Sequence, residues 1–302
     1  MGRMLLLLLS LLIATSAAAA PAGRGQLVRV AGATLWYEVR GAGAGPPLVV
    51  VNGGPGVEHG YLLVSDAWDR IARGRRVVFY DQRGVGRSPR LARGQSCTLA
   101  DQIADLDGLR AHLGVANMDV LGHSWGGYLA MAYAARHPGH VHKLVICDSA
   151  APKWDDTVFL FKDIFPETVQ RQQGMQFAEA MGDTAAIAAD FREYLTMLCY
   201  SPARRAAMRT APPPAFDSAI NDRLNQDLKR YDLNPELPKF AFPTLVMCGR
   251  FDVNVAPSVA WKIHQAIPNS RFHVFEQSGH LPFYEQPDEF VQVIEEFLTA
   301  AS

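Results

Sequence analysis

Ser124 is the residue whose surroundings most clearly predict chemistry in this chain. It stands at the centre of Gly122-His-Ser-Trp-Gly126, between an apolar run that begins at Met118 and a stretch of small residues that continues to Tyr133. A serine in this Gly-x-Ser-x-Gly setting caps a sharp strand-to-helix turn, in which glycine is needed two positions before and after it. The turn exposes the hydroxyl and directs the unpaired N–H groups of the helix N-terminus toward an anion that forms there. The pattern predicts a nucleophile, and a glycine-rich turn without chemistry is the alternative.

A serine hydroxyl needs a general base, and that base needs an orienting partner. Functional side chains of open α/β sheets gather at the carboxyl ends of strands. Asp252 and His280 each follow a strand-like run in the last third of the chain. We therefore expect Ser124 to attack a carbonyl carbon, His280 to take and return the proton, and Asp252 to orient the imidazole. The order Ser, Asp, His along the chain is that of an α/β-hydrolase.

The anion of a tetrahedral intermediate needs two preorganised N–H donors. The amide of Trp125, the residue after the nucleophile, is expected to be one of them. The loop Asn52-Gly-Gly-Pro-Gly56 follows a buried strand and is expected to supply the other. Gly54 is the preferred donor in this loop and Gly53 is the alternative.

The segments around these residues alternate between strand and helix patterns. Alternating apolar residues over 26–40 predict an antiparallel hairpin, and continuous apolar runs predict strands buried on both faces. Such runs occupy 47–51, 76–80, 118–122, 143–147, 242–248 and 271–275, and helical patterns occupy 99–113, 257–267 and 287–298. This alternation favours a mainly parallel sheet with helices on both faces.

Residues 151–239 interrupt the alternation. Helical patterns cover 157–165, 166–181, 184–198 and 215–229, with a Pro-rich joint at 212–214 and no strand-like run. An all-helical insertion of this kind is typical of a cap over one end of a sheet. We therefore divide the chain after its first residues into a core segment (23–150), a helical cap (151–239) and a second core segment (240–302).

Composition and the N-terminus limit the class of protein. The chain has 302 residues, of which 49% are hydrophobic, and its net charge of −1 argues against nucleic acid or an anionic membrane surface as a partner. Residues 1–22 have the pattern of a secretory signal peptide, with Arg3, an apolar run from Met4 to Ile13 and small residues up to Ala22. That run is short for a membrane span, although an uncleaved anchor helix is the alternative. We expect a periplasmic or secreted protein without stable membrane insertion once the signal is removed.

Four cysteines in an oxidising compartment raise the question of a disulfide. Cys147 and Cys248 lie in apolar runs and are expected to be buried thiols, whereas Cys97 and Cys199 have more polar sequence neighbours. A bridge between Cys97 and Cys199 is the resulting hypothesis. No Cys-x-x-Cys or His-x-His spacing suggests a metal site.

Five motifs together carry a family resemblance: Asn52-Gly-Gly-Pro-Gly56, Asp81-Gln-Arg-Gly-Val-Gly-Arg-Ser88, Gly122-His-Ser-Trp-Gly-Gly127, Gly249-Arg-Phe-Asp252 and Ser278-Gly-His280. The chain resembles the prolyl iminopeptidase family of α/β-hydrolases. The resemblance implies a mostly parallel eight-stranded sheet with helices on both faces and a helical cap. It also implies release of an N-terminal residue, often proline, from a small peptide through an acyl-enzyme, without cofactor or metal. The family usually has histidine where Asn52 stands, but a polar side chain there can still hold the loop by hydrogen bonds.

The cap determines which substrate is accepted. An aminopeptidase holds a free α-ammonium, usually with acidic side chains of the cap, and Glu193 and Asp190 are the favoured candidates. The other acidic residues considered are Asp155, Asp156, Asp163, Glu167 and Glu179. A carboxylesterase or lactonase with the same triad is the alternative, and its cap is expected to be mainly apolar. A non-catalytic homologue is a second alternative, against which the intact Ser124, Asp252 and His280 argue.

Overall fold

An eight-stranded sheet forms the centre of the molecule. The computed structural model describes residues 25–180 and 183–300, and the predicted signal peptide at 1–22 lies outside them. The strand order is β1-β2-β4-β3-β5-β6-β7-β8, in which β1 pairs antiparallel with β2, β2 pairs antiparallel with β4, and the other neighbours are parallel. The strands are β1 (Gln26–Val30), β2 (Ala33–Arg40), β3 (Leu48–Val51), β4 (Val77–Asp81), β5 (Met118–His123), β6 (Val141–Cys147), β7 (Thr244–Gly249) and β8 (Arg271–Phe275). The expected mostly parallel sheet of eight strands is confirmed.

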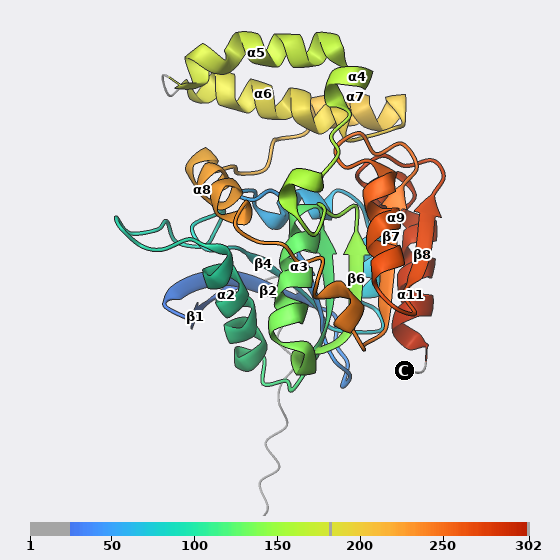
Figure 1. Ribbon diagram of the computed structural model, residues 1–302. Coiled ribbons are helices and arrows are strands. Elements are labelled where there is room, and N and C mark those ends of the chain that lie inside the picture. Colours follow the sequence, from blue (N-terminus) through green and yellow to red (C-terminus); the bar gives the residue numbers. More distant parts are fainter. Residues whose placement is uncertain (1–24, 181–182, 301–302) are drawn as a thin grey trace, which may run out of the picture.

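Helices cover both faces of this sheet (Figure 1). One apolar core contains residues of α2 (Leu99–His112), α3 (Trp125–Arg136) and α9 (Pro257–Ala266), and the other contains residues of α1 (Ala67–Ile71), α10 (Pro282–Glu285) and α11 (Pro287–Thr299). Successive residues of β3 alternate between the two cores, with Val49 in the first and Val50 in the second. Side chains of a strand point alternately to the two faces, so a strand buried on both sides is a continuous apolar run.

Helices of the 151–239 segment lie above the carboxyl ends of the strands (Figure 1). They are α4 (Phe161–Ile164), α5 (Pro166–Ala180), α6 (Thr184–Met197), α7 (Pro202–Thr210) and α8 (Ser218–Leu228). The pattern of the sequence did not predict α7. This short helix is mainly polar, and Met208 is its only buried residue, so no apolar run marks it in the sequence. Pro202 at its first position and the Ser201 side chain that accepts the Arg204 amide mark its start. Among the described residues, no helix has the length and apolar character needed to cross a membrane.

The disulfide hypothesis for Cys97 and Cys199 is wrong. All four cysteines are free and buried. Cys97 belongs to the apolar core on the α2 and α3 side of the sheet, and Cys199 belongs to the core on the opposite side. Polar neighbours in the sequence suggested exposure, but long-range packing buries both thiols and places the sheet between them.

Asp107, on α2, accepts hydrogen bonds from three neighbours and supports a prediction about acid stability. The His140 Nδ1, Arg110 Nε and Tyr133 hydroxyl lie 2.6, 2.9 and 3.0 Å from its Oδ1. Burial raises the pKa of Asp107, but the hydrogen bonds from Arg110, His140 and Tyr133 outweigh burial and lower the pKa to about 2. Because the folded pKa lies below the unfolded value, the stabilisation is present above pH ~4 and is lost between pH ~4 and ~2, and partial exposure to solvent reduces its size.

We therefore expect Asp107→Asn to lower the midpoint of thermal unfolding at pH 7. The same change should flatten the pH dependence of that midpoint between about pH 4 and 2. Scanning calorimetry across this range measures both quantities, and Asp222→Asn at an exposed position of α8 is the control. A variant with the wild-type acid profile would contradict the assignment.

Candidate active site

Ser124 occupies a strained turn between β5 and α3. Its backbone has φ 59° and ψ −127°, and α3 begins at the next residue. Residues other than glycine rarely adopt a positive φ. A Cβ atom at Gly122 would collide with the Gly126 carbonyl oxygen, and one at Gly126 would collide with the Val51 carbonyl oxygen. The two glycines therefore allow the close backbone approach that holds Ser124 at the head of α3.

The loops after β7 and β8 bring Asp252 and His280 together. The His280 Nδ1 lies 2.7 Å from Asp252 Oδ2, and both side chains are almost fully buried. Asp252 Oδ1 accepts the amides of Asn254 and Val255 at 2.8 and 3.0 Å, which fixes the orientation of this carboxyl group. An Nδ1–H donor leaves the His280 Nε2 lone pair as the acceptor, as a general base requires. Ser124 and His280 line one cavity of about 330 Å³.

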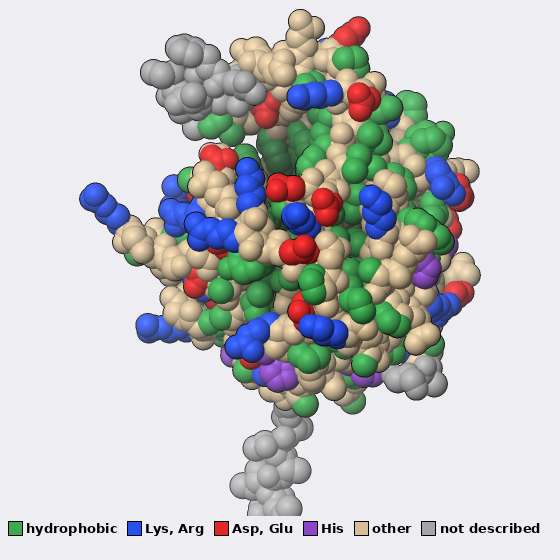
Figure 2. Space-filling view, viewed as in Figure 1, with side chains coloured by type: hydrophobic (Ala, Val, Ile, Leu, Met, Phe, Trp, Pro, Cys, Tyr) green, Lys and Arg blue, Asp and Glu red, His purple; other side chains and the backbone are tan. Residues whose placement is uncertain are grey.

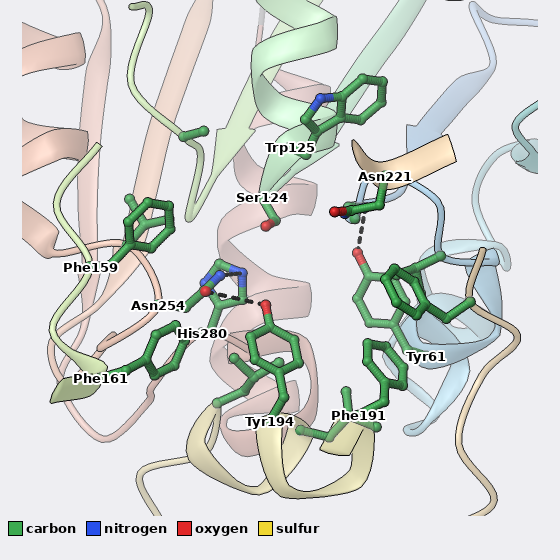
Figure 3. A pocket seen from close by; sticks show the side chains of 18 of the residues that line it. Tyr61, Ser124, Trp125, Phe159, Phe161, Phe191, Tyr194, Asn221, Asn254 and His280 are labelled. Atoms are coloured by element: carbon green, nitrogen blue, oxygen red, sulfur yellow. Dashed lines mark hydrogen bonds between the residues drawn. The ribbon is translucent and has the colours of Figure 1, made fainter. Parts of the chain in front are cut away.

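Asn254 and a cap residue contact the free nitrogen of His280. Asn254 Nδ2 lies 2.8 Å from His280 Nε2, and the Tyr194 hydroxyl of α6 donates to Asn254 Oδ1 at 3.2 Å (Figure 3). The His280 amide also donates to the carbonyl of Leu198 at the end of α6. Within the described residues, Asn254 rather than Ser124 therefore hydrogen-bonds to the base. Catalytic hydrogen bonds are often completed only in the substrate complex, so this arrangement is compatible with the expected role of His280 as the base for Ser124.

The loop after β3 presents one free amide beside Ser124. Asn52 Nδ2 donates to the carbonyls of Gly53 and Val57 at 3.1 and 2.6 Å, so the expected role of Asn52 in holding the loop is confirmed. The Gly53 amide donates to the Tyr61 hydroxyl oxygen at 2.6 Å. In the described part of the chain the Gly54 amide has no acceptor, and Trp125, as the first residue of α3, has no intrahelical acceptor for its amide. The amides of Gly54 and Trp125 are thus available for an oxyanion, whereas that of Gly53 is occupied.

A buried chain of hydrogen bonds joins the loops around the nucleophile. The Tyr61 hydroxyl lies 2.7 Å from His123 Nδ1, and His123 Nε2 lies 2.8 Å from the His280 carbonyl oxygen. Burial, with a smaller contribution from His280, lowers the pKa of His123 well below its usual value, so the ring is neutral. The carbonyl can only accept, so Nε2 carries the proton and Nδ1 accepts from Tyr61. The chain Gly53, Tyr61, His123, His280 fixes the oxyanion loop, the turn and the histidine loop relative to one another.

Tyr61→Phe removes the central member of this chain. The Gly53 amide and His123 Nδ1 would both lose their partner, and a buried polar group without a partner costs about 1–3 kcal/mol. We expect a lower free energy of unfolding together with a lower kcat, because the oxyanion loop loses its support. Tyr128→Phe is the matched control, since the buried Tyr128 hydroxyl has no hydrogen-bond partner among residues 25–180 and 183–300 and its removal should not destabilise the protein. Equal unfolding free energies for the two variants would contradict this account.

The cavity above Ser124 is mainly aromatic. Phe159 and Phe161 lie on one side, Tyr61 and Phe191 lie on the other, and Tyr194 stands between them (Figure 3). The space-filling view shows a recess with hydrophobic side chains beneath the cap (Figure 2). The amide side chains along the wall are those of Gln172, Asn221, Asn225 and Asn254.

The two favoured amine-binding candidates lie in different environments. Asp190 is the only carboxylate among the described residues that line the cavity. Glu193 does not line the cavity, and its Oε2 lies 3.1 Å from Arg171 NH2 in an exposed ion pair. Asp155, Asp156, Asp163 and Glu167 are also not among the lining residues, and the side chain of Glu179 lies outside the described part of the structure. The structure thus brings Asp190, and not Glu193, to the cavity that holds Ser124.

Comparison with known proteins agrees with this architecture. Residues 46–287 match the family model of the alpha/beta hydrolase fold, and the chain belongs to that family. Within it, the chain is similar to proline iminopeptidases, as the motifs indicated. It is 30% identical over 275 residues to the enzyme of Heyndrickxia coagulans, covering 85% of this chain and 92% of the relative. The identity to the proline iminopeptidase of Clostridium botulinum is also 30%, over 280 residues, with 87% and 94% covered.

The solved structures that this chain resembles include an esterase. The thermophilic esterase from Thermogutta terrifontis has a TM-score of 0.68 and 27% identity, with 90% of this chain and 98% of the esterase covered. The chain is thus an α/β hydrolase with proline iminopeptidase relatives, and the identity of the bond that it cleaves is a separate question.

Proposed function

We propose that this chain is a serine hydrolase that releases an N-terminal proline or a similar residue from small peptides. The supporting observation is that Ser124, His280 and Asp190 line one cavity. Ser124 supplies the hydroxyl that attacks the scissile carbonyl, and Asp190 supplies an anion for the free α-ammonium of the same residue. An aminopeptidase requires both groups at one site because its substrate carries the ammonium next to the reacting carbonyl.

The proposed reaction has two halves. In the first, His280 Nε2 takes the proton of the Ser124 hydroxyl as its oxygen attacks the carbonyl carbon, and the Gly54 and Trp125 amides stabilise the oxyanion. His280 then returns the proton to the leaving amine, and the released residue remains as an ester on Ser124. In the second half, His280 takes a proton from a water molecule as the water oxygen attacks the ester carbonyl carbon. His280 then gives that proton to the Ser124 oxygen as the ester bond breaks, which releases the free acid and regenerates the Ser124 hydroxyl. Asp252 orients the imidazole and stabilises its charged form in both halves.

Asp190 is suited to bind a cation. Burial raises the pKa of its carboxyl, with a further contribution from the charge of Glu193. In the described residues no Lys or Arg forms an ion pair with Asp190. A partly buried carboxylate without a cationic partner gains a charge-assisted hydrogen bond when an ammonium arrives. The aromatic rings around it favour a cation further and match the apolar ring of proline.

Asp190→Asn tests this role. We expect KM for a proline aryl-amide to rise about tenfold or more, because a hydrogen bond to a charged group contributes about 1.5–3 kcal/mol. Hydrolysis of a short acyl ester without an amine should change little. Glu193→Gln is the matched control, as this carboxylate pairs with Arg171 outside the cavity. A larger effect of Glu193→Gln than of Asp190→Asn would reverse the assignment.

A carboxylesterase is the second candidate, and the aromatic wall of the cavity favours it. With one carboxylate among many rings, the cavity also fits the uncharged acyl chain of an ester. The two functions separate when a proline aryl-amide, its N-acylated form and a short acyl ester are compared by kcat/KM. An aminopeptidase loses activity on the N-acylated substrate, whereas an esterase prefers the ester and is indifferent to a free amine.

Export is part of the proposal and rests on residues 1–22. Expression of the full chain followed by fractionation, with mass spectrometry of the purified protein, gives the compartment and the mature N-terminus. We expect cleavage near Ala20 or Ala22 and recovery outside the cytoplasm. A cytoplasmic protein with an intact N-terminus would contradict it.

A further inference from the structure

A second buried carboxyl group lies beside Asp252. Asp148 directly follows β6, the neighbour of β7 in the sheet, and only 1% of it is exposed. One carboxylate oxygen of each, and one ring nitrogen of His280, all lie within 4.8 Å of one another. Two buried carboxyl groups this close repel each other when both are ionised, which favours a pair that holds one proton between them.

The hydrogen-bond donors around the pair indicate which group holds that proton. Asp252 accepts the amides of Asn254 and Val255 and the Nδ1–H of His280. Asp148 accepts one amide, that of Gly249 at 2.8 Å, and its Oδ2 lies 3.1 Å from the Cys147 sulfur, a weak donor. More and stronger donors stabilise negative charge on Asp252. Burial and the charge of Asp252 raise the pKa of Asp148 well above its ordinary value, which agrees with a proton on Asp148 rather than on Asp252.

The other titratable groups near the two aspartates do not change which of them holds the proton. Cys147 of β6 and Cys248 of β7 are buried thiols, and burial, followed by the charges of the two aspartates, raises the pKa of Cys248 beyond its usual range. Tyr194 of α6 is half-buried, and burial, followed by the charge of Asp252, raises the pKa of its hydroxyl. These three groups are therefore neutral near pH 7. A ring nitrogen of His123 also lies within 4.8 Å of an Asp148 carboxylate oxygen, and burial lowers the pKa of His123 so that this ring is neutral. The other neighbour is His280, whose charge changes during the proposed reaction.

The backbone at Asp148 directs its side chain toward this pair. Its φ is 47°, in the left-handed region that aspartate, asparagine and glycine tolerate better than other residues. The turn places the carboxyl group against the end of β7, where the Gly249 amide binds it. Asparagine satisfies the backbone and the shape of the site but cannot ionise. A difference between aspartate and asparagine here therefore reports on the proton.

We propose that Asp148 is a positioning residue that donates its proton in a hydrogen bond to Asp252 and can supply the negative charge beside His280 when the Asp252 carboxylate is absent. The proposal rests on the proposed Ser124, His280 and Asp252 triad. In the intact protein the hydrogen bond holds the Asp252 carboxylate against the imidazole as His280 becomes charged. Without Asp252, the Asp148 proton passes to water and leaves a carboxylate within 4.8 Å of the ring.

A double-mutant cycle tests the proposal with an activated acyl ester. The four proteins are wild type, Asp148→Asn, Asp252→Ala and the double variant, compared by kcat/KM. Asp148→Asn is expected to cost about fivefold in the wild-type background, since an amide is a weaker donor than a carboxylic acid. In the Asp252→Ala background, Asp148→Asn should lower kcat/KM by a further ~10²-fold, because no carboxylate then remains beside His280. The double variant should therefore be ~10⁴-fold less active than wild type. The single Asp252→Ala variant should also gain activity with rising pH as Asp148 ionises, and the double variant should not.

The proposal would be overturned if Asp148→Asn lowered kcat/KM by the same factor in both backgrounds, because the free-energy effects of independent sites are additive. Infrared difference spectra provide a measurement that needs no activity. At neutral pH the carbonyl-stretching band of a protonated carboxylic acid should be present in wild type and absent from Asp148→Asn, and its absence from wild type would also overturn the proposal. Failure of the triad itself is distinguishable, because Ser124→Ala and His280→Ala would then retain activity whatever the cycle shows.

Discussion

Ser124→Ala is expected to remove hydrolysis of both amide and ester substrates, with kcat lowered by roughly 10⁶-fold, as in other triad hydrolases. The hydroxyl oxygen forms the bond to the substrate, and no other residue of the described cavity wall combines a hydroxyl with a position at the head of α3. The fold should be unaffected, because alanine has a Cβ like serine and the Ser124 side chain makes no capping hydrogen bond.

Two measurements accompany this prediction. Thermal unfolding should give nearly the same midpoint for the variant and the wild type, and an organophosphorus reagent that labels active serines should modify only the wild type. Ser258→Ala, at an exposed position of α9, is the control and should retain full activity. Turnover of an activated ester by Ser124→Ala would reject Ser124 as the nucleophile.

Gly53→Ala is expected to cause the second largest fall in kcat, because it places a methyl group against Ser124. A Cβ atom at Gly53 would lie 2.8 Å from the Ser124 Cβ and 2.9 Å from the Tyr61 hydroxyl oxygen. The Gly53 backbone is outside the left-handed region, so alanine meets no backbone strain there. The added methyl group pushes the oxyanion loop away from Ser124. We expect kcat to fall by about 10²–10³-fold, the loss seen when an oxyanion donor is removed.

Gly74→Ala is the matched control for this variant. A Cβ atom at Gly74 would have no heavy atom within 4 Å, so activity should be unchanged. We expect Gly53→Ala to lower kcat but to leave KM for a small ester nearly constant, because a displaced oxyanion donor weakens binding of the transition state and not of the substrate. Wild-type kcat in Gly53→Ala would show that the loop does not contribute to the stabilisation of the oxyanion.

Features set by neighbours in the sequence could be predicted without the structure. The continuous apolar runs indicated the buried strands, and the glycines around Ser124 indicated the turn. The rule that functional groups follow parallel strands located Asp252 and His280. The same rule applied to β6 would have singled out Asp148, which directly follows that strand.

Other members of the site gave no local signal. His123 occupies a variable position of the Gly-x-Ser-x-Gly pattern, and Tyr61 lies in a short 3-10 helix, η1 (His59–Leu63). Their role arises only because β5, this helix and the loop after β8 converge on one point. Asn254 is similar, since its partners Tyr194 and His280 come from the cap and from another loop.

The sequence by itself determined the α/β-hydrolase class, and it predicted Ser124 as the nucleophile and Asp252 and His280 as the two residues that activate it. These conclusions depend on local periodicity, on the steric demands of glycine and on chain order. Only the tertiary structure decided that the Gly53 amide is occupied while that of Gly54 has no acceptor in the described part of the chain. It also decided that Asp190 rather than Glu193 lines the cavity, and that Cys97 and Cys199 belong to the cores on opposite sides of the sheet. Each of these depends on contacts between residues far apart in the chain, which no local pattern encodes.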